Sequence, residues 1–146
     1  MLRHVRPFER AWVFDVDAGR ARAFAAAASR ELGIPVTATP DLARATIESQ
    51  IIVTCTTSRR PFLDVRHASP GACIAAMGAD NAEQSEIEPA LMAAAVVVTD
   101  STEQCAAMGD LHHAITAGAM AGATSGRSWA TSSPTWRAGG ATPRRS

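Results

Sequence analysis

The chain has 146 residues, enough for one domain with a single core that buries roughly two-thirds of the surface of the unfolded chain. Its 14 basic and 14 acidic side chains cancel, so no net field gathers nucleic acid or an anionic membrane. No apolar run approaches the ~20 residues of a membrane span, and the N-terminus has no apolar signal core. We therefore expect a soluble, cytoplasmic protein.

The cysteines and the basic residues give information on the cellular compartment and on the coding sequence. Cys55, Cys73 and Cys105 are far apart and show no CxxC spacing, which predicts small buried side chains in a reducing compartment. All 14 Lys or Arg positions are Arg, and Ala is abundant. This composition indicates a GC-rich coding sequence.

The first segment predicts a strand followed by an amphipathic helix. Residues 11–16 (AWVFDV) are a short apolar run, and apolar side chains then recur at helical spacing from residue 21 to 32. Asp17 is placed as the helix N-cap, and Gly33 lies just past the last turn.

The alternation of strands and helices continues to about residue 120. Residues 50–57 (QIIVTCTT) are β-branched and unbroken, which predicts a strand buried on both faces. Short strands alternating with helices predict an α/β fold with a parallel sheet. We expect further strands at 35–37, 72–78 and 95–100, the last being the clearest, and helices at 41–48, 88–93 and 101–120, with an interruption at Gly109.

The last 26 residues, 121–146, are rich in Ser, Thr, Gly, Arg and Pro and have no apolar period. This composition predicts a disordered tail. Back-translated with GC-rich codons and read one base out of frame, the segment from Thr124 gives an amphipathic helix start, DVRAELGDVVA. We therefore expect residues after about Ala123 to be a frameshift product.

Candidate binding residues follow the predicted strands, because ligands of open parallel sheets bind outside the carboxyl ends of the strands. Asp15 and Asp17 stand where a Rossmann fold places the acid that accepts hydrogen bonds from the adenosine ribose. A helix N-cap explains Asp17 equally well and Asp15 less well. No GxGxxG turn precedes residues 11–16, so the chain is expected to start after its own phosphate site.

Four segments in order resemble the ornithine cyclodeaminase/mu-crystallin family over residues 1 to about 120. They are LRHVRPFERAWVFDVD, IIVTCTTSRRPFL, AMGADNAEQSEIEPAL and VVVTDSTEQCAAMGDLHHAITAGAM. The sequence of the third segment, and the stretch GDLHHAI in the fourth, are most similar to the cyclodeaminase-like branch of the family, which is linked to ectoine utilisation. On this resemblance the chain is a truncated, partial Rossmann (NAD(P)-binding) parallel sheet with flanking helices, lacking the first βα unit.

The resemblance implies a lyase of amino-acid metabolism that uses NAD or NADP. Hydride leaves Cα of ornithine or a related basic amino acid, the side-chain amine attacks the imine, ammonia departs, and the returning hydride gives a cyclic imino acid such as proline. Asp80 matches the catalytic acid/base, which must reach the substrate nitrogen. The positions that match cofactor contacts are Asp15, Thr54, Thr56, Met77, Gly78 and Ala79.

Two departures from the family pattern lie next to Asp80. Gln84 stands where the family usually has Lys, so a cationic contact is absent, and Glu83 stands where Gly is usual. The family's N-terminal part supplies substrate-binding residues and much of a homodimer interface. We therefore expect the chain alone to be unstable or aggregated, and inactive. A ketimine reductase or amino-acid dehydrogenase, and a non-enzymatic mu-crystallin-like binding protein, remain alternatives.

Other polar residues have simpler explanations. Glu83, Glu86 and Glu88 could hold a divalent metal with Asp80, but a solvated acidic loop before a helix explains them better, and no metal is predicted. His112 and His113 point about 100° apart on a helix and cannot chelate one metal, so we expect one to pack and one to be exposed. Arg59 and Arg60 could contact a cofactor phosphate, although a solvated loop pair is the simpler interpretation.

Overall fold

A computed structural model describes residues 6–121 and 127–128. They group into unit 1 (residues 6–55 and 63–77) and unit 2 (residues 56–62, 78–121 and 127–128). Composition predicts a single core, whereas each unit has buried apolar residues of its own. These residues are Ala21, Ala25, Ala45, Ile52 and Leu63 in unit 1, and Ile87, Leu91, Leu111 and Ala114 in unit 2.

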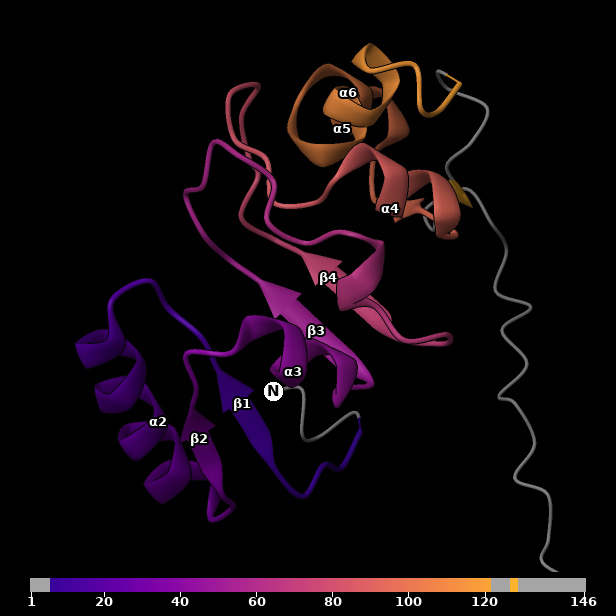
Figure 1. Ribbon diagram of the computed structural model, residues 1–146. Coiled ribbons are helices and arrows are strands. Elements are labelled where there is room, and N and C mark those ends of the chain that lie inside the picture. The colour runs from indigo at the N-terminus through magenta and orange to yellow at the C-terminus, as the bar shows by residue number, and fades with distance from the viewer. Residues whose placement is uncertain (1–5, 122–126, 129–146) are drawn as a thin grey trace, which may run out of the picture. The chain divides into compact units, whose positions relative to one another are not determined.

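Unit 1 begins with a parallel βαβ motif (Figure 1). Strand β1 (Ala11–Val13) pairs with β2 (Val36–Ala38), and helix α2 (Ala18–Leu32) connects them and packs on both. Asp17 caps the helix start, and Gly33 ends the helix with φ +64°, a left-handed conformation that glycine adopts without steric cost. The predicted helix and caps are confirmed, whereas the strand predicted over residues 11–16 extends over Ala11–Val13 only.

A second parallel strand pair completes unit 1 (Figure 1). Helix α3 (Leu42–Ile47), capped by Asp41, leads into β3 (Ile51–Thr54), which pairs with β4 (Cys73–Ala76). The prediction that β3 is buried on both faces is wrong, because the Val53 side chain, between buried neighbours, is 53% exposed. Side chains alternate across a strand, so this pattern means that only one face of β3 is covered.

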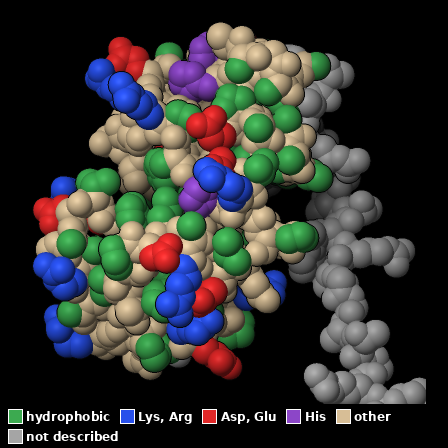
Figure 2. Space-filling view, in the orientation of Figure 1, with side chains coloured by type: hydrophobic (Ala, Val, Ile, Leu, Met, Phe, Trp, Pro, Cys, Tyr) green, Lys and Arg blue, Asp and Glu red, His purple; other side chains and the backbone are tan. Residues whose placement is uncertain are grey.

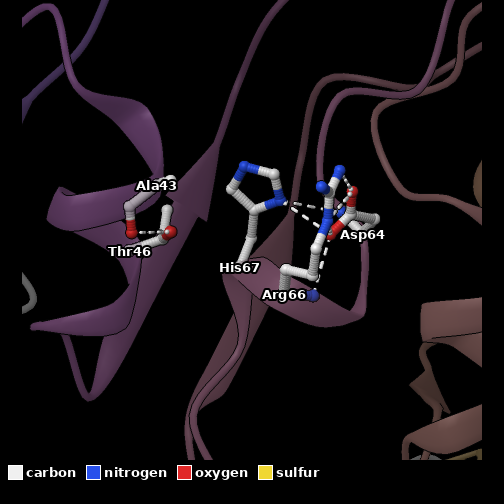
Figure 3. A network of polar contacts seen from close by, with 5 residues as sticks. All are labelled: Ala43, Thr46, Asp64, Arg66 and His67. Carbon is white, nitrogen blue, oxygen red and sulfur yellow. Dashed lines mark hydrogen bonds and ion pairs between the residues drawn. The ribbon is translucent and has the colours of Figure 1, made fainter.

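Between β3 and β4, a polar network shapes a 3₁₀ turn, η1 (Val65–His67) (Figure 3). Arg66 and His67 both turn toward Asp64: Arg66 Nη2 lies 2.7 Å from Asp64 Oδ2, and His67 Nδ1 lies 3.0 Å from Asp64 Oδ1. The Arg66 guanidinium, followed by the Arg66 backbone N–H, holds the pKa of the Asp64 carboxyl well below its usual range. The carboxylate therefore caps this turn as an anion.

Three helices build the core of unit 2. Helices α4 (Pro89–Ala94) and α5 (Thr102–Ala107) both pack against α6 (Gly109–Thr116) (Figure 1). The predicted interruption of the last helical segment at Gly109 is confirmed. Strand β5 (Val98–Thr99) pairs in parallel with β6 (Arg127–Ser128), which lies within the segment predicted to be a disordered tail. The rest of that tail after residue 121 lies outside the described residues.

Two sequence-based expectations fail in the packing. The strand predicted at 95–100 is ordered as a strand over two residues only, and Val96 is 84% exposed. A continuous apolar run shows only that the segment is hydrophobic. A strand also requires hydrogen-bond partners for its backbone along its whole length. The cysteines are not buried: Cys55 and Cys73 are exposed, and Cys105 is intermediate.

Charges of opposite sign are interspersed on the face shown in Figure 2, where Arg side chains lie beside acidic ones. The ion pairs of unit 1 include Arg44 with Glu48 at 3.0 Å and Arg20 with Asp17 at 3.6 Å. These are exposed pairs, which contribute little to stability. Among the described helices, none combines the length and apolarity that crossing a bilayer requires.

The N-cap of α2 predicts an acid-sensitive helix. Asp17 Oδ1 accepts hydrogen bonds from Gly19 N (2.8 Å) and Arg20 N (3.1 Å), and these backbone bonds, that of Arg20 first, lower the Asp17 pKa below its ordinary 3.8. Because the folded value is the lower one, the stabilisation is complete above the unfolded value and is lost as pH falls through the folded value. When the pH is lowered, circular dichroism should show a loss of helix in the wild type that is absent from Asp17→Asn. An identical acid limb in Asp17→Asn, whose amide still caps but cannot ionise, would contradict the assignment.

Candidate functional site

A buried carboxylate in unit 2 joins the loops that follow β3 and β4. The Glu86 side chain is fully buried, with Oε1 2.6 Å from Thr56 N and Oε2 2.9 Å from Gly78 N. Each backbone N–H donates to one carboxylate oxygen, so both amides are satisfied by one side chain. This arrangement contradicts the prediction that Glu86 is a solvated loop charge.

Gly78 is required at this position because there is no room for a side chain. A Cβ built there would collide with the Thr56 backbone nitrogen and oxygen and would lie 2.5 Å from Glu86 Oε1. Two of these three atoms belong to backbone, which cannot turn away. The close approach of residues 56 and 78 therefore depends on glycine.

A second buried acid holds Glu86 itself in place. Asp110 Oδ1 accepts hydrogen bonds from Glu86 N at 2.7 Å, Ile87 N at 3.0 Å and Ser85 Oγ at 3.2 Å. Asp110 lies in the first turn of α6, directly after Gly109, which adopts φ +77°. The start of α6 thereby fixes the backbone from which the Glu86 carboxylate extends.

Asp80 lies in the loop that this framework supports. Its side chain is exposed, and Asn81 Nδ2 lies 3.4 Å from Asp80 Oδ1. The loop is closed by Asn81 Oδ1, which accepts from Glu83 N and Gln84 N, both at 3.0 Å. Glu83 is an exposed loop charge paired with Arg59 at 3.1 Å. An accessible carboxylate on an internally bonded loop is suited to proton transfer with a small molecule.

The remaining predicted site residues lie in unit 1. Thr54 is buried at the end of β3, and its carbonyl accepts from Met77 N at 2.8 Å, while the Met77 side chain is 70% exposed. Asp15 follows β1, where Oδ1 accepts from Asp17 N at 2.8 Å and Oδ2 lies 3.9 Å from Arg20 Nε. Unit 1 thus brings Thr54 and Met77 together, and unit 2 brings Thr56, Gly78, Ala79 and Asp80 together.

A sequence profile of the ornithine cyclodeaminase/mu-crystallin family matches residues 1–131. The chain belongs to this family. The match extends past residue 123, where the frameshift is predicted to begin, and the frameshift itself stays a prediction.

Relatives with known names include a cyclodeaminase and two solved reductases. An uncharacterized cyclodeaminase of Sinorhizobium fredii is 36% identical over 121 residues, covering 82% of this chain and 37% of the relative. The iminosuccinate reductase of Paracoccus denitrificans, solved with NAD⁺, is 33% identical with a TM-score of 0.78, covering 86% of this chain and 38% of that one. The Δ1-pyrroline-2-carboxylate reductase of Thermococcus litoralis, solved with NADH and L-proline, is 26% identical with a TM-score of 0.78, covering 82% and 37%. The α/β fold with a partial Rossmann sheet is confirmed, and the chain spans less than two fifths of these relatives.

Two adjacent histidines, His112 and His113, lie in the middle of α6. Both are half-buried, so the expectation that one would be exposed is wrong. His112 Nδ1 lies 3.0 Å from Ala106 O and His113 Nε2 lies 3.1 Å from Gln84 O. Since a carbonyl only accepts, these nitrogens carry the protons. His113 therefore supports the backbone of the Asp80 loop.

Sequence reasoning missed the residues that support the loop, namely Glu86, Asp110 and Gln84. The apolar Ile87 indicates that the chain turns inward there, but nothing in the sequence indicates that the neighbouring Glu86 turns inward as well. Carboxylates near a helix start are usually solvated, and only the two amide donors from separate loops make burial favourable here.

Proposed function

We propose that this chain is part of an NAD(P)-dependent enzyme that moves a hydride between the cofactor and the α-carbon of an amino acid or α-imino acid. Asp80 is the acid/base that exchanges a proton with the substrate nitrogen. The observation that carries the proposal is the Asp80 loop after β4, held by two buried carboxylates yet leaving the Asp80 side chain exposed. The solved reductases of the family, named with NAD⁺ and NADH, support the cofactor.

The residues present fit two parts of such a cofactor. Asp15, at the end of β1, would accept hydrogen bonds from the adenosine ribose hydroxyls, and Thr54 with Met77, at the ends of β3 and β4, would lie along the nicotinamide side. In unit 2, Thr56, Gly78 and Ala79 would contribute backbone surface. No GxGxxG motif occurs in the 146 residues, so we expect weak pyrophosphate contacts and weak cofactor affinity in the isolated chain.

Two substrate classes share this hydride step. Cyclodeamination of ornithine oxidises the amine to an imine, loses ammonia after cyclisation and reduces the product again, with no net change of the cofactor. Imine reduction uses the second half of that sequence alone. The names of the solved relatives at 26% and 33% identity favour imine reduction, and the Sinorhizobium fredii relative favours cyclodeamination. An amino-acid substrate and a homodimer are part of this proposal.

The proposal predicts a large catalytic effect at Asp80. In a chimera in which residues 6–121 replace the matching segment of the Paracoccus denitrificans reductase, Asp80→Asn should lower kcat on iminosuccinate by roughly 10²–10⁴-fold, since the amide cannot exchange the proton. NADH oxidation measures turnover, and NADH fluorescence measures cofactor binding, which should change little. Ornithine with NAD⁺ and an ammonia assay tests cyclodeamination in the same protein.

Asp64→Asn is the matched control, because Asp64 is a carboxylate of unit 1 that is engaged with Arg66 and His67. It should leave kcat within a factor of about two. An Asp80→Asn chimera with full kcat would refute the acid/base role. Binding of NADH with no turnover of any amino or imino acid would favour a binding protein of the mu-crystallin kind.

A further inference from the structure

The Gln84 side chain reaches back to the Asp80 carboxylate. With its amide nitrogen turned toward the loop, Gln84 Nε2 lies 2.8 Å from Asp80 Oδ1 and 2.7 Å from Gly78 O. The opposite orientation would set the amide oxygen against these two oxygens and would gain only a longer bond, 3.3 Å, from Asp80 N, so the nitrogen belongs there. One amide group, with two hydrogens, thus donates to both ends of the turn.

The two oxygens of Asp80 are therefore not equivalent. Oδ1 accepts from Gln84 Nε2 at 2.8 Å and lies 3.4 Å from Asn81 Nδ2. Among the residues that the structure describes, no group bonds to Oδ2. A carboxyl oxygen already accepting from an amide has less capacity for a proton than its partner. Protonation of this carboxyl is thereby directed to Oδ2.

The backbone of Gln84 is held from two sides. Its backbone N–H donates to Asn81 Oδ1 at 3.0 Å, and its carbonyl accepts from His113 Nε2 at 3.1 Å. Ordering a glutamine side chain costs rotamer entropy. A backbone fixed from two sides lowers the conformational cost of presenting the amide to Asp80.

The charged groups around this contact do not supply an alternative donor. Arg59 is paired with Glu83 at 3.1 Å, and the Glu86 and Asp110 carboxylates accept from backbone amides. The donors on Asp80 Oδ1 are therefore neutral amides, so they orient the carboxylate without adding a positive charge.

We propose that Gln84 is a positioning residue that binds Asp80 Oδ1 and leaves Oδ2 as the oxygen that exchanges the proton. This inference rests on the proposed function, because it assigns the atom through which Asp80 acts. It also gives a role to the position where the family usually carries Lys: here the carboxylate is oriented by a neutral donor.

Nuclear magnetic resonance of the full 146-residue chain tests the contact without any cofactor. As the pH is lowered, the side-chain NH₂ resonances of Gln84 should shift with the same midpoint as the Asp80 side-chain carbon. They should stay slowly exchanging on both sides of that midpoint, because the proton goes to Oδ2 and the Gln84 bond persists. In Asp80→Asn the pH-dependent shift of Gln84 should disappear.

Gln104 is the internal control, since it is an exposed glutamine on α5 in the same unit and should not follow Asp80. A Gln84 resonance that ignores the Asp80 titration, or one that loses its protection when Asp80 is protonated, would overturn the proposal. These outcomes do not depend on turnover. Failure of the acid/base role appears instead as full kcat in the Asp80→Asn chimera.

Discussion

Replacing Glu86 with Ala should destabilise the chain by about 2–4 kcal/mol, because the Thr56 and Gly78 amides each lose their acceptor in a part-buried setting. Chemical denaturation of the full chain measures this. Glu83→Ala, which removes an acid of the same loop that is exposed and paired with Arg59, should cost less than ~1 kcal/mol. Comparing the two losses of stability distinguishes the contribution of a buried carboxylate from that of a surface carboxylate.

A conservative variant keeps this prediction testable if Glu86→Ala does not fold. Glu86→Gln retains one acceptor oxygen and sets an NH₂ group against a backbone N–H. Hydrogen exchange should therefore become faster at Thr56 N or Gly78 N, with the remaining core amides less affected. Equal stability of Glu86→Ala and Glu83→Ala would show that the two amides do not depend on Glu86.

Gly78→Ala is the second change with a large expected effect. The new Cβ meets the Thr56 backbone and lies 2.5 Å from Glu86 Oε1, so the two loops must separate. Forced overpacking of this kind costs about 1–3 kcal/mol, and more where backbone must move. Thermal or chemical unfolding of the full chain measures the loss, and the Asp80 loop amides should shift in the nuclear magnetic resonance spectrum.

Gly19→Ala is the matched control for this substitution. Gly19 lies in the first turn of α2, where the nearest atom to a new Cβ is Asp17 Oδ1 at 3.1 Å, the end of a side chain that can shift. Ala also loses less backbone entropy than Gly in a helix, so stability should be unchanged or slightly raised. If Gly78→Ala were as well tolerated as Gly19→Ala, residues 56 and 78 would not be in close contact.

The effects of these variants on function follow from the same geometry. In the proposal Glu86 touches neither substrate nor cofactor, and Gly78 offers the cofactor only its backbone, yet both residues fix the backbone that carries Asp80. Small displacements of a catalytic group can cost large factors in rate, because the reacting atoms must stay within hydrogen-bond reach. In the Glu86 and Gly78 variants, turnover and stability should therefore fall together. Asp80→Asn, in contrast, should lower turnover without a matching loss of stability.

Local signals predicted most of the secondary structure. The Asp17 N-cap, the Gly33 C-cap and the break at Gly109 are all confirmed, because caps and left-handed glycines depend on a few neighbouring residues. The strand at 95–100 was overestimated, since its extent depends on a pairing partner that lies far along the chain. Burial of Val53 and of the cysteines was also wrong, because burial depends on what packs against a face.

The candidate site divides in the same way. The order of motifs along the sequence identifies the family. The family resemblance in turn points to Asp80 and to the cofactor-contact positions, whose roles remain proposals. The supporting residues Glu86, Asp110 and Gln84 did not follow from the pattern, because their partners are backbone amides and a carboxylate brought together only by folding.

The sequence by itself determined the family, the alternation of parallel strands and helices, and the position of an acid after the fourth strand, because these depend on local composition and order. Only the tertiary structure decided which acids are buried and which is exposed. A carboxylate is stable inside a protein when donors converge on it, and the amides that converge on Glu86 come from loops more than 20 residues apart in sequence, at Thr56 and Gly78. Asp80 and Glu83 stay accessible in this loop, and of these two Glu83 is paired with Arg59.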